Sequence, residues 1–224
     1  TVHIVVASDV DCYAAEEILA RWETVRTIGL PTGSTPEGIY GWLVQYFYDG
    51  RLSFSHKTTF NLDEHVGLAP NDPASYRATM QRLLMQYVDL PAAQFRVPPG
   101  LTMDVDDACA AYEAEIDSSG GLDLCILGIG VNGHVAFNEP GSSKSSRTRR
   151  VTLADSPRGR YAAAAGVDAD SVPREWLTIG IATLPEARAI PLVAKSYPHA
   201  QALARAPLGP DTPAVPASLL PAPP

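Results

Sequence analysis

A glycine-rich loop at residues 128–140 holds the densest group of chemically capable side chains in this sequence. Asn132, His134, Asn138 and Glu139 follow one another closely there, directly after a short apolar run at residues 122–127. Glycine lets a backbone turn sharply and approach a ligand closely. An imidazole exchanges protons near neutral pH, and a carboxylate five residues later can support it. We interpret the loop as proton-transfer machinery rather than as an ordinary polar loop.

A second group consists of Asp63, Glu64 and His65, which directly follow a strand-like run at residues 57–62. Adjacent carboxylates raise each other's pKa, and removal from water raises it further. One of these acids can therefore act as a base toward a carbon acid. The alternative interpretation is a solvated acidic loop.

A third group is Thr32, Gly33, Ser34 and Thr35, followed by Pro36. Thr35 and Pro36 are typical of the cap and first position of a helix. The amides at a helix N-terminus have no partner within the helix, so the segment could cradle an anion. It is not a P-loop, because no Gly-Lys-Ser/Thr follows. A plain capped turn is equally compatible with these residues.

Other kinds of catalytic site find little support in the sequence. The loop histidine has no second His or Cys at ligand spacing, so we expect no metal site. No serine nucleophile elbow is present. Cys12, Cys109 and Cys125 form no Cys-x-x-Cys pair and are odd in number, as expected for reduced thiols in a cytoplasmic protein.

Alternating elements must position these three groups. The patterns predict strands at residues 2–7, 27–30, 57–62, 122–128, 177–181 and 189–194, and helices at 11–25, 35–47, 71–87 and 105–118, with a short helix between the last two strands and another from about His199. Strands that alternate with helices predict an α/β fold with a mostly parallel sheet covered on both faces. We expect a single domain over residues 1–224, with an irregular tail rich in Pro and Ala from about residue 207.

Composition narrows the range of partners. The chain of 224 residues is 46% hydrophobic and 19% charged, with a net charge of -8 and no long basic run, which argues against nucleic acid. No apolar run approaches the roughly 20 residues of a membrane helix. The first residues lack the basic region of a signal peptide, so we interpret residues 2–7 as a strand. The expected partner is a small molecule, and a homo-oligomer is left open.

Five stretches together resemble the glucosamine-6-phosphate deaminase (isomerase) family. They are LPTGSTP at 30–36, FNLDEHVGL at 60–68, SY at 75–76, LGIGVNGHVAFNEP at 127–140 and SRTR at 146–149. The related 6-phosphogluconolactonases share a Gly-rich His loop but lack the Phe-Asn-Glu-Pro continuation. The resemblance implies a three-layer α/β/α, Rossmann-like fold that needs no cofactor. It also implies conversion of glucosamine 6-phosphate and water to fructose 6-phosphate and ammonia.

The resemblance further implies roles for single residues. Asp63 matches the base that moves a proton between C2 and C1, and His134 matches the residue that opens the sugar ring. Glu139 matches the acid that supports this histidine, and Asn132 can orient His134 but cannot share its charge. The implied substrate-binding residues are Thr32, Gly33, Ser34 and Thr35 of the sugar-phosphate loop, together with Glu64, Gly133 and His199.

The sequence departs from the family pattern at the phosphate. The positions of the family's phosphate-binding Arg and Lys fall on Ala163 and His199. Loss of two charge-assisted contacts should weaken phosphate binding substantially. Arg158, Arg160 and Lys195 lie nearby in the sequence and are candidate replacements.

Further departures concern regulation and the end of the chain. The family's allosteric pocket is matched only in part, by Ser142 and Arg149, because Val151 replaces its second basic residue. The chain stops near Pro221, where members usually continue into a further strand, and the connection at residues 23–26 is short.

Three hypotheses follow. The first is a deaminating isomerase of an amino-sugar phosphate. The second is a related enzyme that keeps the same acid and base groups but acts on a different or unphosphorylated sugar. The third is a sugar-phosphate sensor with weak or no catalysis, against which the joint retention of Asp63, His134 and Glu139 argues.

Overall fold

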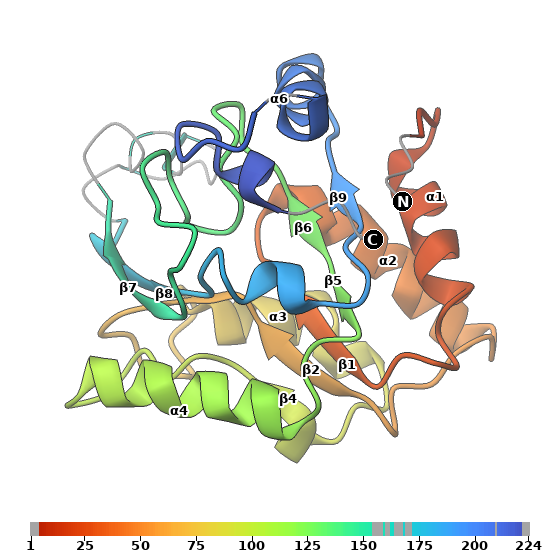
Figure 1. The fold of residues 1–224 in the computed structure, drawn as a ribbon. Coiled ribbons are helices and arrows are strands. Elements are labelled where there is room, and N and C mark those ends of the chain that lie inside the picture. Colours follow the sequence, from red (N-terminus) through yellow and green to blue (C-terminus); the bar gives the residue numbers. More distant parts are fainter. Residues whose placement is uncertain are drawn as a thin grey trace.

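The centre of the fold is a parallel sheet in the strand order β4-β2-β1-β5. The computed structural model describes residues 5–153, 159, 162–163, 168, 172–208 and 210–220. These four strands are β1 (Thr27–Leu30), β2 (Thr58–Asn61), β4 (Phe95–Arg96) and β5 (Leu124–Cys125). After Ile126 the last strand resumes as β6 (Leu127–Gly128), which pairs in parallel with β9 (Leu192–Val193). The expected mostly parallel sheet is therefore confirmed (Figure 1).

A separate antiparallel sheet follows the end of β2. The sequence patterns did not predict this sheet. The chain continues past Leu62 as β3 (Asp63–His65), which pairs with β8 (Glu175–Thr178), and β8 pairs in turn with β7 (Arg149–Thr152). The register places Asp63 directly opposite Thr178. β3 and β7 escaped prediction because both are polar in sequence, without the apolar alternation of a half-buried strand.

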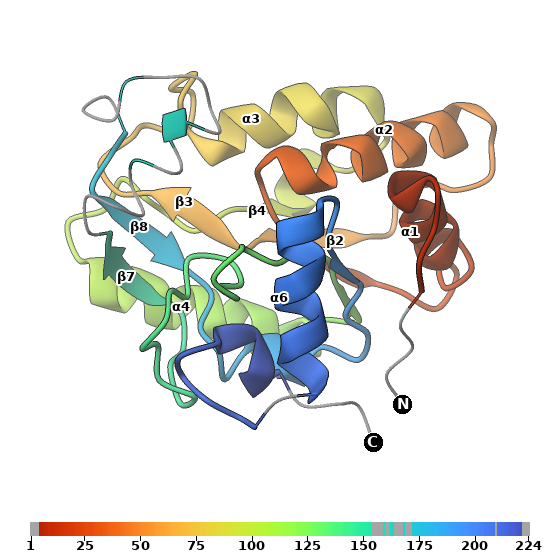
Figure 2. The ribbon, with the colours of Figure 1, turned by 90° about the horizontal axis from the view of Figure 1, so that it is seen from above.

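Helices cover both faces of the sheet and complete three layers. Figure 2 shows α1 (Val10–Leu19), α2 (Ser34–Tyr48) and α3 (Tyr76–Leu83) on one side, and α4 (Val105–Ser118) and α6 (Tyr197–Leu208) on the other. Each side has its own buried cluster, one around Ile28 and Leu43 and the other around Phe60 and Tyr112. Short 3-10 turns complete the described elements: η1 (Met85–Tyr87), η2 (Ala92–Gln94), η4 (Leu184–Glu186) and η5 (Pro216–Leu219).

Two expectations at the N-terminal end differ from the described structure. Residues 5–7 form no strand, and Val6 is 96% exposed; residues 1–4 lie outside the described part. The helix expected over residues 11–25 ends at Leu19, and the backbone carbonyls of Trp22 and Val25 instead accept hydrogen bonds from Lys57 Nζ at 2.6 and 2.7 Å.

The other expected elements lie at or within a few residues of their predicted positions. The helix expected over 105–118 is α4, begun by the Asp104 side chain, which accepts hydrogen bonds from two backbone amides. The helix expected over 71–87 begins only at Tyr76, behind the cap Ser75. The predicted strand at 177–181 is β8, shifted toward the N-terminus, and the predicted helix near His199 is α6.

The C-terminal segment packs against the body of the protein. Ala217 and Leu219 are buried in the cluster beneath α4 and α6. The backbone amide of Ala217 donates to the carbonyl of Gly133 at 2.8 Å, and that of Gly141 donates to the carbonyl of Pro213 at 2.8 Å. The irregular C-terminal segment therefore holds the glycine-rich loop through backbone hydrogen bonds.

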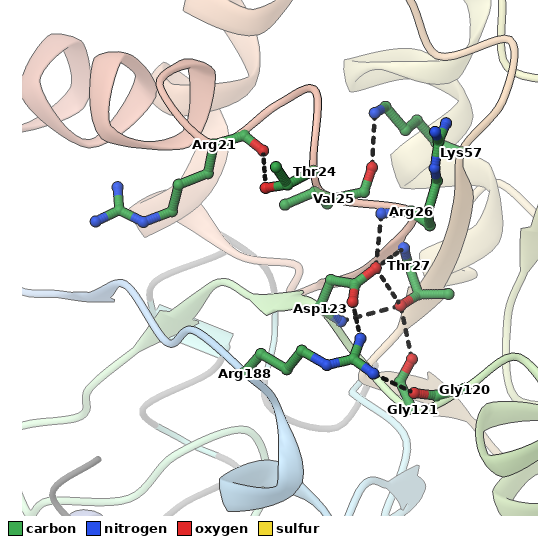
Figure 3. Close-up of polar contacts among 10 residues, drawn as sticks. All are labelled: Arg21, Thr24, Val25, Arg26, Thr27, Lys57, Gly120, Gly121, Asp123 and Arg188. Atoms are coloured by element: carbon green, nitrogen blue, oxygen red, sulfur yellow. Dashed lines mark hydrogen bonds and ion pairs between the residues drawn. The ribbon is translucent and has the colours of Figure 1, made fainter. Parts of the chain in front are cut away.

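A polar network ties β1 to β5 where both strands begin (Figure 3). One carboxylate oxygen of Asp123 accepts hydrogen bonds from the backbone amides of Arg26 and Thr27, at 2.6 and 3.0 Å. The Thr27 hydroxyl donates to the carbonyl of Gly121 at 2.6 Å, and Arg188 pairs with the other oxygen of Asp123. This network therefore fixes β1 and β5 relative to each other at the ends opposite the candidate site.

No helix in the described part of the chain is both long and apolar enough to cross a membrane.

Candidate active site

The three groups singled out in the sequence follow the carboxyl ends of neighbouring strands. Residues 32–35 follow β1, Asp63 follows β2, and the glycine-rich loop follows β6. Because the strands are parallel, these ends share one edge of the sheet, where α/β proteins bind their ligands (Figure 1). A Cβ added at Gly128 would lie 3.5 Å from the Cβ of Thr35, so the first and third groups are neighbours.

Asp63 is a buried carboxyl, with 4% of its surface exposed. Its Oδ1 accepts a hydrogen bond from the Thr178 hydroxyl at 2.5 Å. Burial raises the pKa of Asp63 to about 7, helped by the charge of Glu64, while hydrogen bonds from Thr178 and the Phe137 amide work in the opposite direction. Such a group is both a proton acceptor and a proton donor near neutral pH.

An aromatic cluster adjoins this carboxyl through Tyr76 and Phe137. The rings of His65 and Tyr76 lie 4.4 Å apart, and those of Phe137 and Trp176 lie 4.9 Å apart. Burial lowers the pKa of His65 to about 4, so this imidazole is neutral near pH 7. Burial, and then the charge of Asp63, raise the pKa of Tyr76, whose hydroxyl also interacts with Thr32. Tyr76 therefore interacts with both Asp63 and Thr32 of the first group.

His134 is held by two side chains of its own loop. Its Nδ1 lies 2.7 Å from Oδ1 of Asn132 and 3.5 Å from Oε1 of Glu139. The Asn132 amide nitrogen donates to Oε2 of Glu139 at 2.8 Å, and the His134 backbone amide donates to Oδ1 of Asn132. Oδ1 of Asn132 must therefore face the ring as an acceptor, so Nδ1 is protonated and the lone pair of the neutral imidazole lies on Nε2.

Two glycines make this loop conformation possible. A Cβ at Gly130 would collide with the imidazole of His134. Gly133 has φ of +82°, and a Cβ there would lie 2.6 Å from Cγ1 of Val215 in the C-terminal segment. The loop thus turns tightly beneath His134 and against the tail.

Glu64 was predicted to bind substrate, and its carboxylate contacts the backbone. One oxygen accepts hydrogen bonds from the amides of His65 and Tyr76, and the other accepts one from Arg77, at 2.8 to 2.9 Å. These amides include the free N–H groups at the start of α3, so Glu64 joins that helix to β3. Burial raises the pKa of Glu64, and these three hydrogen bonds oppose the rise. A contact of Glu64 with substrate stays a prediction.

The predicted anion cradle is the N-terminus of α2. The helix begins at Ser34, one residue earlier than the sequence suggested, behind Gly33 with φ of +104°. The Tyr40 hydroxyl donates to the carbonyl of Pro31 at 2.6 Å and holds the preceding turn. The first amides of this helix have no helical acceptor and remain suited to an anion.

Only some of the side chains proposed to bind the substrate's phosphate lie in the described part of the chain. Lys195 pairs with Asp11 at 2.6 Å, and Nδ1 of His199 lies 2.5 Å from the hydroxyl of Ser196. Ala163 is exposed. Arg158 and Arg160 lie outside the described residues.

The residues matched to an allosteric pocket contact each other. Arg149 donates to Oδ1 of Asn138 at 2.8 Å and to the hydroxyl of Ser142 at 3.3 Å. Burial lowers the pKa of Arg149. Val151 lies in β7. Regulation through these residues stays a prediction.

No role was predicted for Thr178, Phe137 or Tyr76, although all three adjoin Asp63 or its partner. Ser75-Tyr76 appeared only within a motif. Thr178 lies 115 residues from Asp63 in the sequence, and no local sequence pattern around either residue predicts their contact. Among the described residues, no group of three or more His, Cys, Asp or Glu side chains could hold a metal ion.

The chain is similar to known proteins over most of its length. Residues 6–223 match the family model described as glucosamine-6-phosphate isomerases/6-phosphogluconolactonase. The chain is 46% identical over 200 residues to the glucosamine-6-phosphate deaminase of Rhodopirellula baltica, covering 89% of this chain and 79% of that protein. It is 42% identical over 206 residues to glucosamine-6-phosphate deaminase 2 of Bacillus subtilis, covering 92% and 82%.

Solved structures match over nearly the whole chain. A monomeric glucosamine-6-phosphate deaminase superposes with a TM-score of 0.89 at 37% identity, covering 94% of this chain and 88% of that one. A 6-phosphogluconolactonase from Thermotoga maritima superposes with a TM-score of 0.75 at 19% identity, covering 96% and 92%. The second likeness concerns the fold alone.

Proposed function

The chain belongs to the glucosamine-6-phosphate isomerase/6-phosphogluconolactonase family, and from this premise we propose that it converts glucosamine 6-phosphate and water to fructose 6-phosphate and ammonia. The observation that carries the proposal is a buried carboxyl with a pKa of about 7, Asp63, at the same sheet edge as the His134 loop. The names of the relatives, deaminases at 42 to 46% identity, favour this reaction over lactone hydrolysis.

Ring opening is the proposed task of His134. The lone pair on Nε2 can accept the proton of the C1 hydroxyl and return it to the ring oxygen, which yields the open-chain aldehyde. Asn132 holds the ring in the tautomer that this step needs. Glu139, 3.5 Å from Nδ1, stabilises the imidazolium that forms during the transfer.

Isomerisation is the proposed task of Asp63. As a carboxylate it removes the proton from C2 of the open-chain amino sugar, and as a carboxylic acid it delivers a proton to C1. The product is an imine at C2, which water hydrolyses to the ketone and ammonia. A pKa of about 7 suits both halves of this transfer, because neither protonation state is strongly disfavoured near neutral pH.

Phosphate recognition is the proposed task of the α2 N-terminus. Residues 32–35 and the first helical amides can hold an anion without a side-chain charge. Lys195 and His199 are the described candidates for additional positive charge. An unphosphorylated amino sugar is the alternative substrate, favoured by Ala163 and His199 at the positions of the family's cations. We also place the enzyme in the cytoplasm, in line with its three free cysteines.

The test is ammonia release by the purified protein from glucosamine 6-phosphate, beside the same assay with glucosamine. We expect ammonia and fructose 6-phosphate in equal amounts from the phosphorylated sugar. Turnover of glucosamine alone would shift the assignment to the unphosphorylated substrate. Binding of either sugar without ammonia release would leave the sensor hypothesis.

A further inference from the structure

We propose that Thr178 is a positioning residue for the proposed base: its hydroxyl orients the Asp63 carboxylate and ties it to the loop that carries His134. The two residues face each other across the antiparallel pair of β3 and β8. The Thr178 hydroxyl donates to Oδ1 of Asp63 at 2.5 Å and accepts a hydrogen bond from the backbone amide of Phe137 at 3.1 Å. This inference rests on the proposed function and adds a residue to it.

The direction of the hydroxyl proton follows from counting donors. A threonine hydroxyl has one proton to give and can accept two hydrogen bonds. The Phe137 amide can only donate, so the proton of Thr178 must point to Asp63 or to the carbonyl of Ile179. The distance to that carbonyl is 3.5 Å, against 2.5 Å to Asp63. Thr178 therefore gives its proton to the carboxyl oxygen, an arrangement that favours the ionised form.

The residue after Thr178 strengthens the link to the loop. The carbonyl of Ile179 accepts a hydrogen bond from the side-chain amide of Asn138 at 2.8 Å, and its backbone amide donates to the carbonyl of Leu62 at 2.9 Å. Residues 178 and 179 thus contact the strand that carries Asp63 on one side and the loop that carries His134 on the other. Phe137 and Asn138 lie three and four residues beyond His134, so the two proposed proton-transfer groups share one support.

Of the neighbours that shift the pKa of Asp63, the Phe137 amide alone works in the same direction as the Thr178 hydroxyl. The charge of Glu64 on β3 raises the pKa of Asp63. Tyr76 on α3, Tyr112 on α4 and Cys125 on β5 interact with the charge of Asp63, and burial raises the pKa of all three. Thr178 and the Phe137 amide are the neighbours that favour ionisation. Loss of the hydroxyl should therefore raise the pKa of Asp63 further and confine activity to higher pH.

The experiment compares Thr178→Val, Thr178→Ser and Thr178→Cys with a matched control, Thr59→Val. Valine keeps the shape without the hydroxyl, serine keeps the hydroxyl, and a thiol is a weaker donor. Thr59 is also fully buried in a strand, and its hydroxyl has no hydrogen-bond partner among the described residues. The readouts are kcat/KM against pH for ammonia release, and the carboxyl titration of Asp63 by 13C NMR, assigned with Asp63→Asn.

We expect the acid limb of kcat/KM and the NMR titration to move up by about one pH unit or more in Thr178→Val, because a hydrogen bond to the charged carboxylate is lost. Thr178→Ser and Thr59→Val should titrate like the wild type, and Thr178→Cys should lie between. If valine prevents folding, the cysteine and serine variants decide the question. Coincident titrations in all the folded variants would overturn the proposal and leave Thr178 a structural role only.

The NMR titration separates this inference from the proposed function. If the wild type releases no ammonia from either sugar, the proposed reaction fails, while the effect of Thr178 on Asp63 is still measured directly. If ammonia is released but Thr178→Val leaves the titration of Asp63 unchanged, the inference fails and the reaction stands.

Discussion

Asn132 presents its side-chain oxygen to Nδ1 of His134 at 2.7 Å while its amide nitrogen donates to Glu139 at 2.8 Å. The amide cannot turn over without losing both contacts. His134 is therefore held with a protonated Nδ1 and with the lone pair of its neutral form on Nε2. An asparagine suffices for this task because orienting the ring requires no charge.

Replacing His134 by glutamine should abolish ring opening without removing the rest of the site. We expect turnover of cyclic glucosamine 6-phosphate to fall by a factor on the order of 10² or more, the usual worth of a positioned acid or base. Binding of acyclic 2-amino-2-deoxyglucitol 6-phosphate, which has no ring to open, should be unchanged by calorimetry. Equal losses in turnover and in binding of this analogue would remove the assigned role.

Gly130→Ala should displace the imidazole, because the added methyl group would occupy the place of the His134 ring. We expect a large loss of kcat in a protein that still folds. Gly41→Ala is the matched control: it lies within α2 with open space around it, and alanine should stabilise the helix by about 0.5–1 kcal/mol. Full activity in Gly130→Ala would show that the loop adapts without the glycine.

The raised pKa of Asp63 predicts a stability penalty at higher pH. In the unfolded chain an aspartate ionises near pH 3.9, whereas in the folded protein Asp63 stays protonated up to about pH 7. Its contribution to the free energy of unfolding therefore falls as pH rises from about 4 to about 7 and is constant beyond.

Asp63→Asn should remove this decline, so the variant should gain stability relative to the wild type at pH 8 more than at pH 4.5. Urea unfolding at the two pH values measures the difference, with the exposed Asp49→Asn as control. An identical change in stability at both pH values would mean that Asp63 ionises in the folded protein as it does in water.

Binding of the phosphate group of the substrate should depend on Lys195 if that side chain leaves Asp11 to contact the phosphate. Lys195→Ala should then weaken binding of glucosamine 6-phosphate but not of glucosamine, whereas Lys144→Ala, which also removes a lysine paired with an aspartate, should weaken neither. Binding titrations of both sugars at pH 6 and pH 8 complete the comparison. A clear preference for the unphosphorylated sugar at both pH values would contradict retained phosphate recognition.

The parts of the fold that the sequence predicted are those with a strong local signal. Residues 105–118 match α4, whose apolar residues have helical spacing, and residues 27–30 match β1, a short strand buried along its whole length. β3 and β7 lacked such a signal, because they are polar strands that exist only through pairing with β8.

The candidate site likewise divides into residues with a local sequence signal and residues without one. Asp63, His134 and the residues 32–35, whose roles stay predictions, were singled out because each follows a strand in a recognisable motif. The contact of Thr178 with Asp63 was not found, because it arises from a strand register between residues 115 positions apart. The backbone partners of Glu64 were also hidden, since a carboxylate beside a catalytic group and one that caps a helix look alike in sequence.

The most direct test of the account compares the wild type with Asp63→Asn for ammonia release from glucosamine 6-phosphate at pH 8. Fructose 6-phosphate is measured in parallel, as is binding of the acyclic amino alditol phosphate. The account predicts equal amounts of ammonia and fructose 6-phosphate from the wild type. It predicts a turnover lower by a factor on the order of 10² or more in the variant, with the analogue still bound. Undiminished turnover in Asp63→Asn, or no ammonia from a wild type that binds the analogue, would contradict it.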